Sequence, residues 1–161
     1  MSFEKCLTLD ANNYGASLQL ANLLVELGQE QCAAKCYQNA IRVKSDSAAA
    51  NFGLILAVLR HPSGSEACSR HLKEVLQHDP DNLTALTQLA LLRFFQYEDV
   101  KCVRLLRKAL QISNSFVPAL VAMGELERFT GRSEIAHKFY ERALMHDQHQ
   151  QIALKGFIKA C

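Results

Sequence analysis

The residues of this sequence that could do chemistry are its six cysteines and six histidines. Cys32 and Cys36 are four residues apart, which would put both thiols on one helix face as two ligands of a zinc ion. No second cysteine or histidine pair has the spacing of a structural zinc site, so the pattern favours thiols that pack as small apolar residues. His146 and His149 stand at the end of a helical segment, where histidine caps carbonyl groups. The sequence therefore predicts no metal site.

Motifs for catalysis and for cofactor binding are not found in the sequence. It contains no glycine-rich loop of the P-loop or dinucleotide type, and neither G-x-S-x-G nor H-E-x-x-H occurs. The loops between the apolar segments are too short to build a pocket with converging titratable groups. We therefore expect no enzymatic activity and no cofactor.

Composition and length are those of an ordinary globular domain. The chain has 161 residues, of which 49% are hydrophobic, and a formal net charge of +2, too small to indicate nucleic-acid binding by itself. No apolar run approaches the roughly 18 residues of a membrane span, and the first residues lack the pattern of a secretion signal. We expect one folding unit, no membrane insertion, and a location in the cytoplasm or the nucleus.

The elements that would position any site are helices, because apolar residues recur at spacings of three and four along the chain. One pattern recurs every 34 or 35 residues: an aromatic residue or leucine, a small residue three positions later, and then an apolar residue. It begins at Tyr37, Leu72, Leu106 and Tyr140, and Phe3-x-x-Cys6-Leu7 has the same form one period earlier. This periodicity predicts an internal repeat.

Each repeat also has an earlier half. Upstream of the recurring pattern lies an apolar segment with a small residue near its middle, at Ala21, Ala90 and Gly124, whereas Leu56 holds this place in the second repeat. Turn residues such as Gly28 and Gly131 separate the two halves. Cys68 and Cys102 occupy a slot that alanine fills in the other repeats, so we expect them to be packing residues. Each repeat is therefore predicted to be a helical hairpin.

This pattern resembles the tetratricopeptide repeat, a helix–turn–helix unit of about 34 residues. The fourth repeat matches best, at Leu120, Met123, Gly124, Gly131, Ala136, Tyr140 and Ala143. Asp79-Pro80-Asp81-Asn82 is similar to the exit turn of that family. The resemblance covers essentially the whole chain. It implies an all-α fold, a right-handed superhelical solenoid of antiparallel helix pairs whose first helices line a concave groove.

The period assigns four complete repeats, at residues 14–48, 49–82, 83–116 and 117–150. Residues 1–13 would be the second helix of a leading partial repeat, and residues 151–161 a terminal helix. Natural arrays end in polar capping helices, yet Phe157 and Ile158 lie close to the last residue. Residues 151–161 would therefore begin a further repeat of a longer array, or would form a short cap.

The helical phase predicts which side chains line the groove: Leu18, Asn22, Val25, Ala57, Arg60, Thr87, Leu91, Phe94, Val121, Glu125 and Arg128. Leu91 and Phe94 would form a pocket for one apolar anchor of a partner. Asn22 and Thr87 would hydrogen-bond an extended main chain. A neighbouring segment of the parent protein or a second copy could fill the same groove.

The resemblance also gives an expectation about heat-shock chaperones. Tetratricopeptide co-chaperones bind the acidic tails of these chaperones with lysine, asparagine and arginine side chains. The corresponding places of this chain hold Leu18, Asn22, Leu54, Thr84 and Gln88, and only the asparagine matches. We therefore do not expect an acidic chaperone tail as the ligand.

The second helices carry a basic outer face. Lys35, Arg70, Arg104 and Lys138 occupy one slot in all four repeats and would form a ladder of positive charge. A solvated face arranged for the helix dipole would have the same composition, because acidic residues stand near the start of each helix. An acidic partner or RNA is the alternative, although no aromatic residues lie between the basic slots to stack on bases.

The function most consistent with these features is a non-enzymatic scaffold or adaptor that binds a peptide or helix with an apolar anchor, as part of a larger assembly. Two alternatives stay open. The basic convex surface would contact an acidic partner or RNA in a ribonucleoprotein assembly, or the chain would form homo-oligomers through its open apolar ends.

Overall fold

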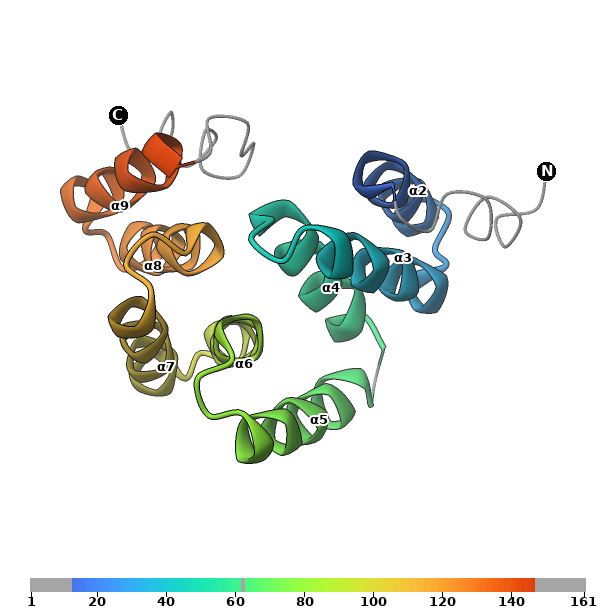
Figure 1. Ribbon diagram of the computed structural model, residues 1–161, viewed down its shortest axis with the longest axis horizontal. Helices are drawn as coiled ribbons and strands as arrows, with labels where there is room; N and C mark the ends of the chain where they lie inside the picture. Colours follow the sequence, from blue (N-terminus) through green and yellow to red (C-terminus); the bar gives the residue numbers. More distant parts are fainter. Residues whose placement is uncertain (1–12, 62, 147–161) are drawn as a thin grey trace. The chain divides into compact units, whose positions relative to one another are not determined.

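The computed structural model describes residues 13–61 and 63–146, and its regular structure there is entirely α-helical (Figure 1). Eight helices follow one another within these residues: α2 (Tyr14–Glu26), α3 (Glu30–Val43), α4 (Ala48–Leu59), α5 (Gly64–His78), α6 (Leu83–Phe95), α7 (Asp99–Ile112), α8 (Val117–Phe129) and α9 (Ser133–His146). The predicted all-α class is confirmed. None of these helices is both long enough and apolar enough to cross a membrane.

The first helix of each pair begins at a residue suited to a helix start. Asn13, Ser47 and Asn82 each accept a hydrogen bond through the side-chain oxygen from the backbone amide three residues later, at 2.9–3.1 Å. Such caps satisfy amides that have no partner inside the helix. Helix α8 instead carries Pro118 in its first turn, where the missing amide costs nothing.

Left-handed residues follow the first helices at the repeat period. Gly28 has φ +74° and Gly131 has φ +85°, and Tyr97 takes the corresponding place with φ +60°. Glycine adopts this conformation without a steric penalty, whereas a bulky residue is strained by it. The turn at Tyr97 therefore requires a left-handed backbone but does not require a tyrosine side chain.

The chain divides into two compact units, Met1–Cys68 and Ser69–Cys161. These are units of packing, so the expectation of a single folding unit stays a prediction. The boundary falls inside α5, within the residues 49–82 that the period assigns to the second repeat. Leu56, in unit 1, is 46% exposed, whereas Ala21 and Ala90 at the corresponding places are fully buried. A leucine is too bulky for the close helix approach that alanine permits.

In unit 1, α3 packs against both α2 and α4. Its buried apolar core consists of Ala21, Leu24, Ala33, Cys36, Tyr37, Leu54 and Ala57. Ala33 and Cys36 are three residues apart on one face of α3, as the predicted packing role of the thiol requires.

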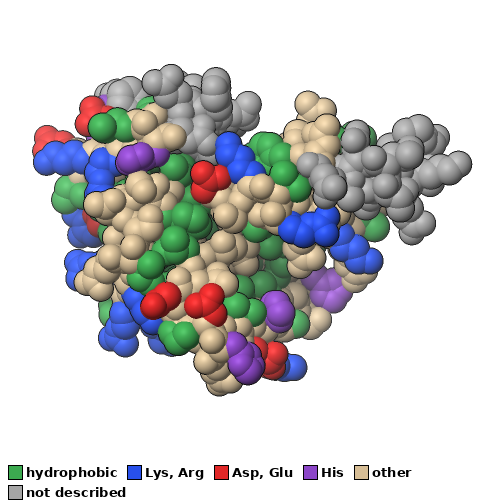
Figure 2. Space-filling view, viewed as in Figure 1, with side chains coloured by type: hydrophobic (Ala, Val, Ile, Leu, Met, Phe, Trp, Pro, Cys, Tyr) green, Lys and Arg blue, Asp and Glu red, His purple; other side chains and the backbone are tan. Residues whose placement is uncertain are grey.

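In unit 2, α7 packs between α6 and α8, and α9 packs against α8. The second helices bury a single face: the buried residues of α7 are Cys102, Leu106 and Ala109. The first helices are buried on nearly all sides, since α6 buries every residue from Ala85 to Leu92. In Figure 2, lysine and arginine side chains gather along the side of the molecule on which Figure 1 shows α7 and α9.

Several predictions concern residues 1–12 and 147–161, which lie outside the described residues. These are the leading partial repeat, the terminal helix, its role as cap or continuation, and the open ends that would allow oligomers. The four repeat boundaries also stay a prediction, although each repeat is assigned to begin within one residue of the start of a helix.

Candidate functional site

The residues predicted to line the groove differ in whether a ligand can reach them. Ala57, Thr87, Leu91 and Val121 are at most 2% exposed. The Thr87 hydroxyl also donates a hydrogen bond to the Leu83 carbonyl at 2.9 Å. These four therefore belong to the core, which corrects the roles predicted for Leu91 as part of a pocket and for Thr87 as a main-chain contact. The reason is that α4, α6 and α8 are mostly apolar and bury residues on several sides, so helical phase alone does not identify an outward side.

The other predicted groove residues keep solvent-accessible surface. In unit 1 these are Leu18, Asn22, Val25 and Arg60, and in unit 2 they are Phe94, Glu125 and Arg128. Arg60 is 53% exposed in its side chain and stands 4.0 Å from Glu30. The structure thus leaves part of the predicted lining available in each unit.

Two polar residues of this set are engaged by buried tyrosines. The Tyr37 hydroxyl donates to Asn22 Oδ1 at 2.7 Å, and the Tyr140 hydroxyl donates to Glu125 Oε1 at 2.8 Å. The two pairs occupy equivalent places in the first and fourth repeats. Burial, followed by the hydrogen bond to Glu125, raises the pKa of Tyr140, so its hydroxyl remains a donor.

The tyrosine and its acceptor vary together along the chain. In the second and third repeats, Leu72 and Leu106 stand at the tyrosine position, and the acceptor positions hold Ala57 and Leu91. A buried hydroxyl requires a hydrogen-bond partner, whereas a leucine does not. We conclude that Asn22 has a structural role, because its Oδ1 atom links α2 to α3 through Tyr37. This oxygen is then less available for the predicted hydrogen bond to the main chain of a ligand.

Glycine makes room for both tyrosine rings. A Cβ atom on Gly53 would lie 2.4 Å from Cε1 of Tyr37, and one on Gly124 would lie 2.5 Å from Cε1 of Tyr140. Gly124 is on α8 and Tyr140 is on α9, so this contact holds the last hairpin together. Gly53 is on α4, sixteen residues after Tyr37, whereas Gly124 is sixteen residues before Tyr140, so the two glycines occupy different places of the repeat and each makes room for a tyrosine ring.

An exposed group of aromatic side chains lies where α6 and α8 end. We call Phe94, Phe95, Tyr97 and Phe129 the aromatic cluster. The ring of Phe94 meets those of Phe95 and Phe129 edge to face, with centroids 5.1 and 5.7 Å apart. Tyr97 lies 6.4 Å from Phe129, and these two residues are 78% and 61% exposed. The rings support one another and still present their surface to solvent.

The charged residues beside the aromatic cluster are paired with one another. Arg93 lies 3.5 Å from Glu98, Arg128 donates to Glu125 at 2.7 Å, and Arg132 bonds to Glu127. The hydrogen bond from Lys101 is the main reason that the pKa of Glu98 is lowered. The rim of the cluster is thus polar, and its arginine and glutamate charges neutralise one another.

Of the aromatic cluster, only Phe94 was predicted from the sequence as a binding residue. The signal for Tyr97 was present, because a large aromatic residue stands where the first and fourth repeats have glycine. Phe95 and Phe129 are one period of 34 residues apart, and a search for unexplained aromatic residues at equivalent positions would have found them. Their meeting with Phe94 depends on how α6 and α8 pack.

The predicted basic ladder is exposed at each of its positions. Lys35 belongs to unit 1, whereas Arg70, Arg104 and Lys138 belong to unit 2. The ladder as a continuous feature therefore stays a prediction.

Three of the four thiols in the described residues are buried or partly buried as predicted, whereas the exposure of Cys32 corrects the packing role predicted for it. Cys36 and Cys102 are buried, Cys68 is partly buried, and Cys32 is exposed. Burial raises the pKa of Cys102 to about 12 and also raises the pKa of Cys36 and Cys68. Among residues 13–61 and 63–146, no three cysteine, histidine, aspartate or glutamate side chains come together in a way that could hold a metal ion.

Comparison with known proteins identifies the fold. No protein-family profile matches the chain, and no curated protein matches it. Among solved structures, TTC0263, a thermophilic TPR (tetratricopeptide repeat) protein of Thermus thermophilus, is 20% identical with a TM-score of 0.62, and the match covers 98% of this chain and 86% of that one. MamA is 21% identical with a TM-score of 0.51, over 90% of this chain and 84% of that one. These likenesses confirm that the chain has the tetratricopeptide fold.

Proposed function

We propose that this chain, a helical array with the tetratricopeptide fold, is a non-enzymatic interaction scaffold that binds a partner protein through the aromatic cluster. The ligand is a peptide or amphipathic helix that buries one apolar anchor residue against Phe94 and Phe129. The single observation that carries the proposal is the exposure of the cluster, 78% for Tyr97 and 61% for Phe129.

Exposed aromatic rings are unfavourable in water unless something covers them. Burying an aromatic or large aliphatic side chain gains about 1.5–3 kcal/mol relative to leaving it exposed. Aromatic residues are also enriched among the few interface positions that supply most of the binding free energy. Several neighbouring rings on one edge therefore favour a binding site over chance exposure.

The backbone at Tyr97 supports the same conclusion. A left-handed conformation at a residue other than glycine costs of order 1 kcal/mol or more. Glycine stands at this place in the first and fourth repeats, so the fold would be more stable with glycine here too. A strained tyrosine that points into solvent is explained by a role of its ring in binding.

The neutral rim indicates the chemistry of the ligand. Because the arginines beside the cluster are paired with glutamates, a ligand does not have to supply carboxylates to neutralise them. This supports an apolar anchor and disfavours an acidic chaperone tail. In unit 1, Leu18, Val25 and Arg60 remain secondary candidates for contact with the same or another partner segment.

Selection of phage-displayed random peptides on the purified chain tests the proposal. Selected peptides should share an aromatic residue or leucine as anchor, and Phe129→Ala should weaken their binding by about 1–3 kcal/mol in fluorescence polarisation. Met145→Ala is the matched control, because Met145 is 79% exposed and lies outside the cluster. Equal losses in the two variants would refute the proposal, as would self-association through the cluster in place of peptide binding.

A further inference from the structure

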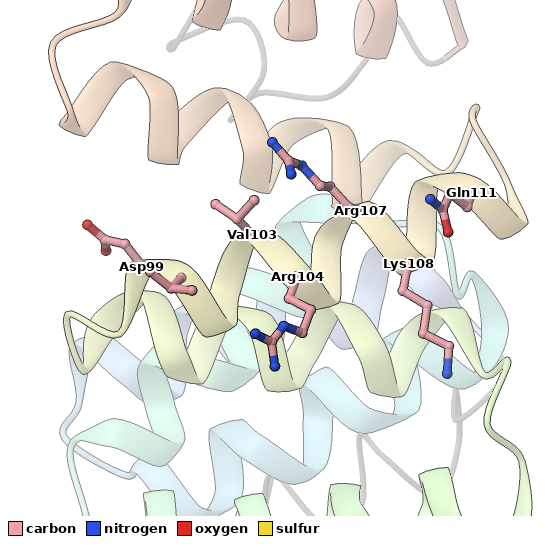
Figure 3. Close-up of a pocket in the computed structure, with 7 residues that line it drawn as sticks. Asp99, Val103, Arg104, Arg107, Lys108 and Gln111 are labelled. Atoms are coloured by element: carbon pink, nitrogen blue, oxygen red, sulfur yellow. The ribbon is translucent and has the colours of Figure 1, made fainter.

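The outer side of α7 bears an open hollow of about 670 Å³. Its lining comes from this one helix: Asp99, Val100, Val103, Arg104, Arg107, Lys108 and Gln111. Figure 3 shows Asp99 and Gln111 toward the two ends of the hollow, with the valine and the basic side chains between them. The hollow lies on the side of α7 opposite to its buried residues, so it does not belong to the core.

The basic side chains of this hollow have no partner within the described part of the chain. Arg104, Arg107 and Lys108 are exposed, and none of them makes a hydrogen bond, an ion pair or a ring contact there. Other cations of unit 2 behave differently. Lys101 pairs with Glu98, and Arg142 donates to the Asn114 carbonyl at 3.1 Å.

The sequence of α7 explains why these charges are unpaired. Positions three and four residues from Arg104 hold valine or another cation, and no acidic residue stands at those distances from Arg107 or Lys108. Residues at these spacings are neighbours on a helix surface, and like charges there destabilise the helix. Side-chain pairing on the surface of α7 therefore does not stabilise this arrangement.

Apolar surface accompanies the charges. Val100 is 74% exposed although it is β-branched and apolar, and Val103 is partly exposed beside it. The half of the hollow nearer the start of α7 thus contains the two valines and Asp99, and the half nearer its end contains the three cations. A complementary partner has apolar side chains facing the valines and carboxylates facing the three cations.

We propose that this face of α7 docks an acidic amphipathic helix of a partner protein, separately from the ligand of the aromatic cluster. Carboxylates are most favourable in the first turns of a helix, because of the helix dipole. Placing that acidic end against Arg107 and Lys108 makes the partner helix antiparallel to α7.

Nucleic acid fits this surface less well. The hollow contains no aromatic side chain on which a base could stack. Exposed valines contribute nothing to a phosphate contact, and Asp99 at one end of the hollow repels it. An acidic helix uses both the cations and the valines.

The test uses a fluorescein-labelled helical peptide about four turns long, with leucine and glutamate at spacings of three and four and the glutamates in its first half. Its counterpart has glutamine in place of each glutamate. Arg104→Gln combined with Lys108→Gln should weaken binding of the acidic peptide about tenfold, as the loss of two exposed charge contacts implies. The control double variant, Lys73→Gln with Arg142→Gln, removes the same charge from exposed positions on other helices and should change the affinity less than twofold.

Further measurements separate the possible occupants. Val100→Ser should weaken the acidic peptide about threefold and leave circular dichroism unchanged, since Val100 is outside the core. Tighter binding of a generic single-stranded RNA than of the peptide, with no effect of Val100→Ser, would overturn the proposal in favour of nucleic acid. Equal losses in the two double variants would overturn it in favour of nonspecific charge attraction.

The outcome is independent of the function proposed above. Phe129→Ala should leave binding of the acidic peptide unchanged. If that substitution abolishes binding and the α7 variants do not, the peptide occupies the aromatic cluster, and only the inference about α7 fails.

Discussion

The aromatic cluster and the outer face of α7 both present arginine side chains beside exposed apolar residues, yet they treat the charges in opposite ways. At the cluster, Arg93, Arg128 and Arg132 are each paired with a glutamate. On α7, the cations in the hollow have no partner within the described residues. The difference lies in the placement of acidic residues, three to five positions away in the first case and beyond reach in the second.

The two surfaces therefore suit different ligands. A neutral rim around aromatic rings favours apolar burial, which is insensitive to salt. Unpaired surface cations favour an acidic partner and guide its approach. Their attraction for that partner weakens as salt screens the charges. Under the two proposals, the chain binds two partners at separate surfaces.

The largest expected effect comes from disrupting the packing of α7 against α6 and α8, which supports both surfaces. Ala109 is fully buried on α7, so Ala109→Glu should lower the free energy of unfolding by roughly 3–5 kcal/mol through overpacking and a buried charge. Urea denaturation measures this loss. Gln111→Glu, on the exposed side of the same helix, should change stability little, and an unchanged midpoint for Ala109→Glu would show that the repeat register is wrong.

A second substitution should disturb the region beside the cluster more than α7. Gly124→Val places a side chain against the Tyr140 ring and should cost about 1–3 kcal/mol of stability. The added side chain should also break the hydrogen bond from Tyr140 to Glu125. Glu125 is the ion-pair partner of Arg128, so this pair should be disturbed as well. Gly15→Ala is the control, because its Cβ atom meets only Asn13 Oδ1 at an ordinary 3.5 Å. Equal thermal stability of the two variants would contradict the role of the glycine–tyrosine contact.

The effect of salt on binding affinity should differ between the two surfaces. Raising the ionic strength from about 0.1 M to 1 M shortens the screening length from about 10 to 3 Å. The acidic peptide should then bind α7 at least tenfold more weakly, whereas a selected apolar peptide should bind the cluster with nearly the same affinity. The same salt dependence of both affinities in isothermal titration calorimetry would show that the two surfaces do not differ in this way.

Tyr97 allows stability and binding to be changed in opposite directions. Tyr97→Gly should stabilise the fold by about 0.5–1 kcal/mol, because it relieves the left-handed strain. The same change should weaken the ligand of the aromatic cluster and leave the α7 peptide unaffected. Loss of stability without loss of binding would mean that the tyrosine has a structural role.

The smallest expected effect is on α7 itself. Arg104→Glu replaces a repulsive pair with Lys108 by a favourable one, four residues apart and with the acid first. Stability should rise by about 0.2–0.5 kcal/mol. Binding of the acidic peptide should be lost. A fall in stability would show that Arg104 has an internal partner.

The sequence by itself determined the repeat, the helices and the fold class. Its period of 34 or 35 residues, the turn glycines and the caps at Asn13 and Asn82 act over a few residues or one hairpin, so they can be read without knowing the whole structure. The thiols at the alanine slot were also predictable, since Cys102 packs as an alanine would.

Tertiary packing alone decided which surfaces remain available. Helical phase identifies an outward side only when a helix has a polar face, and α6 and α8 have almost none, so Thr87, Leu91 and Val121 are buried. Two contacts join residues from different helices: the hydrogen bond between Tyr140 and Glu125 and the ring contact between Phe94 and Phe129. The division into two units likewise depends on how closely the helices approach one another. Local periodicity carries no information on such distances, because they are set by side-chain volume at the helix contacts.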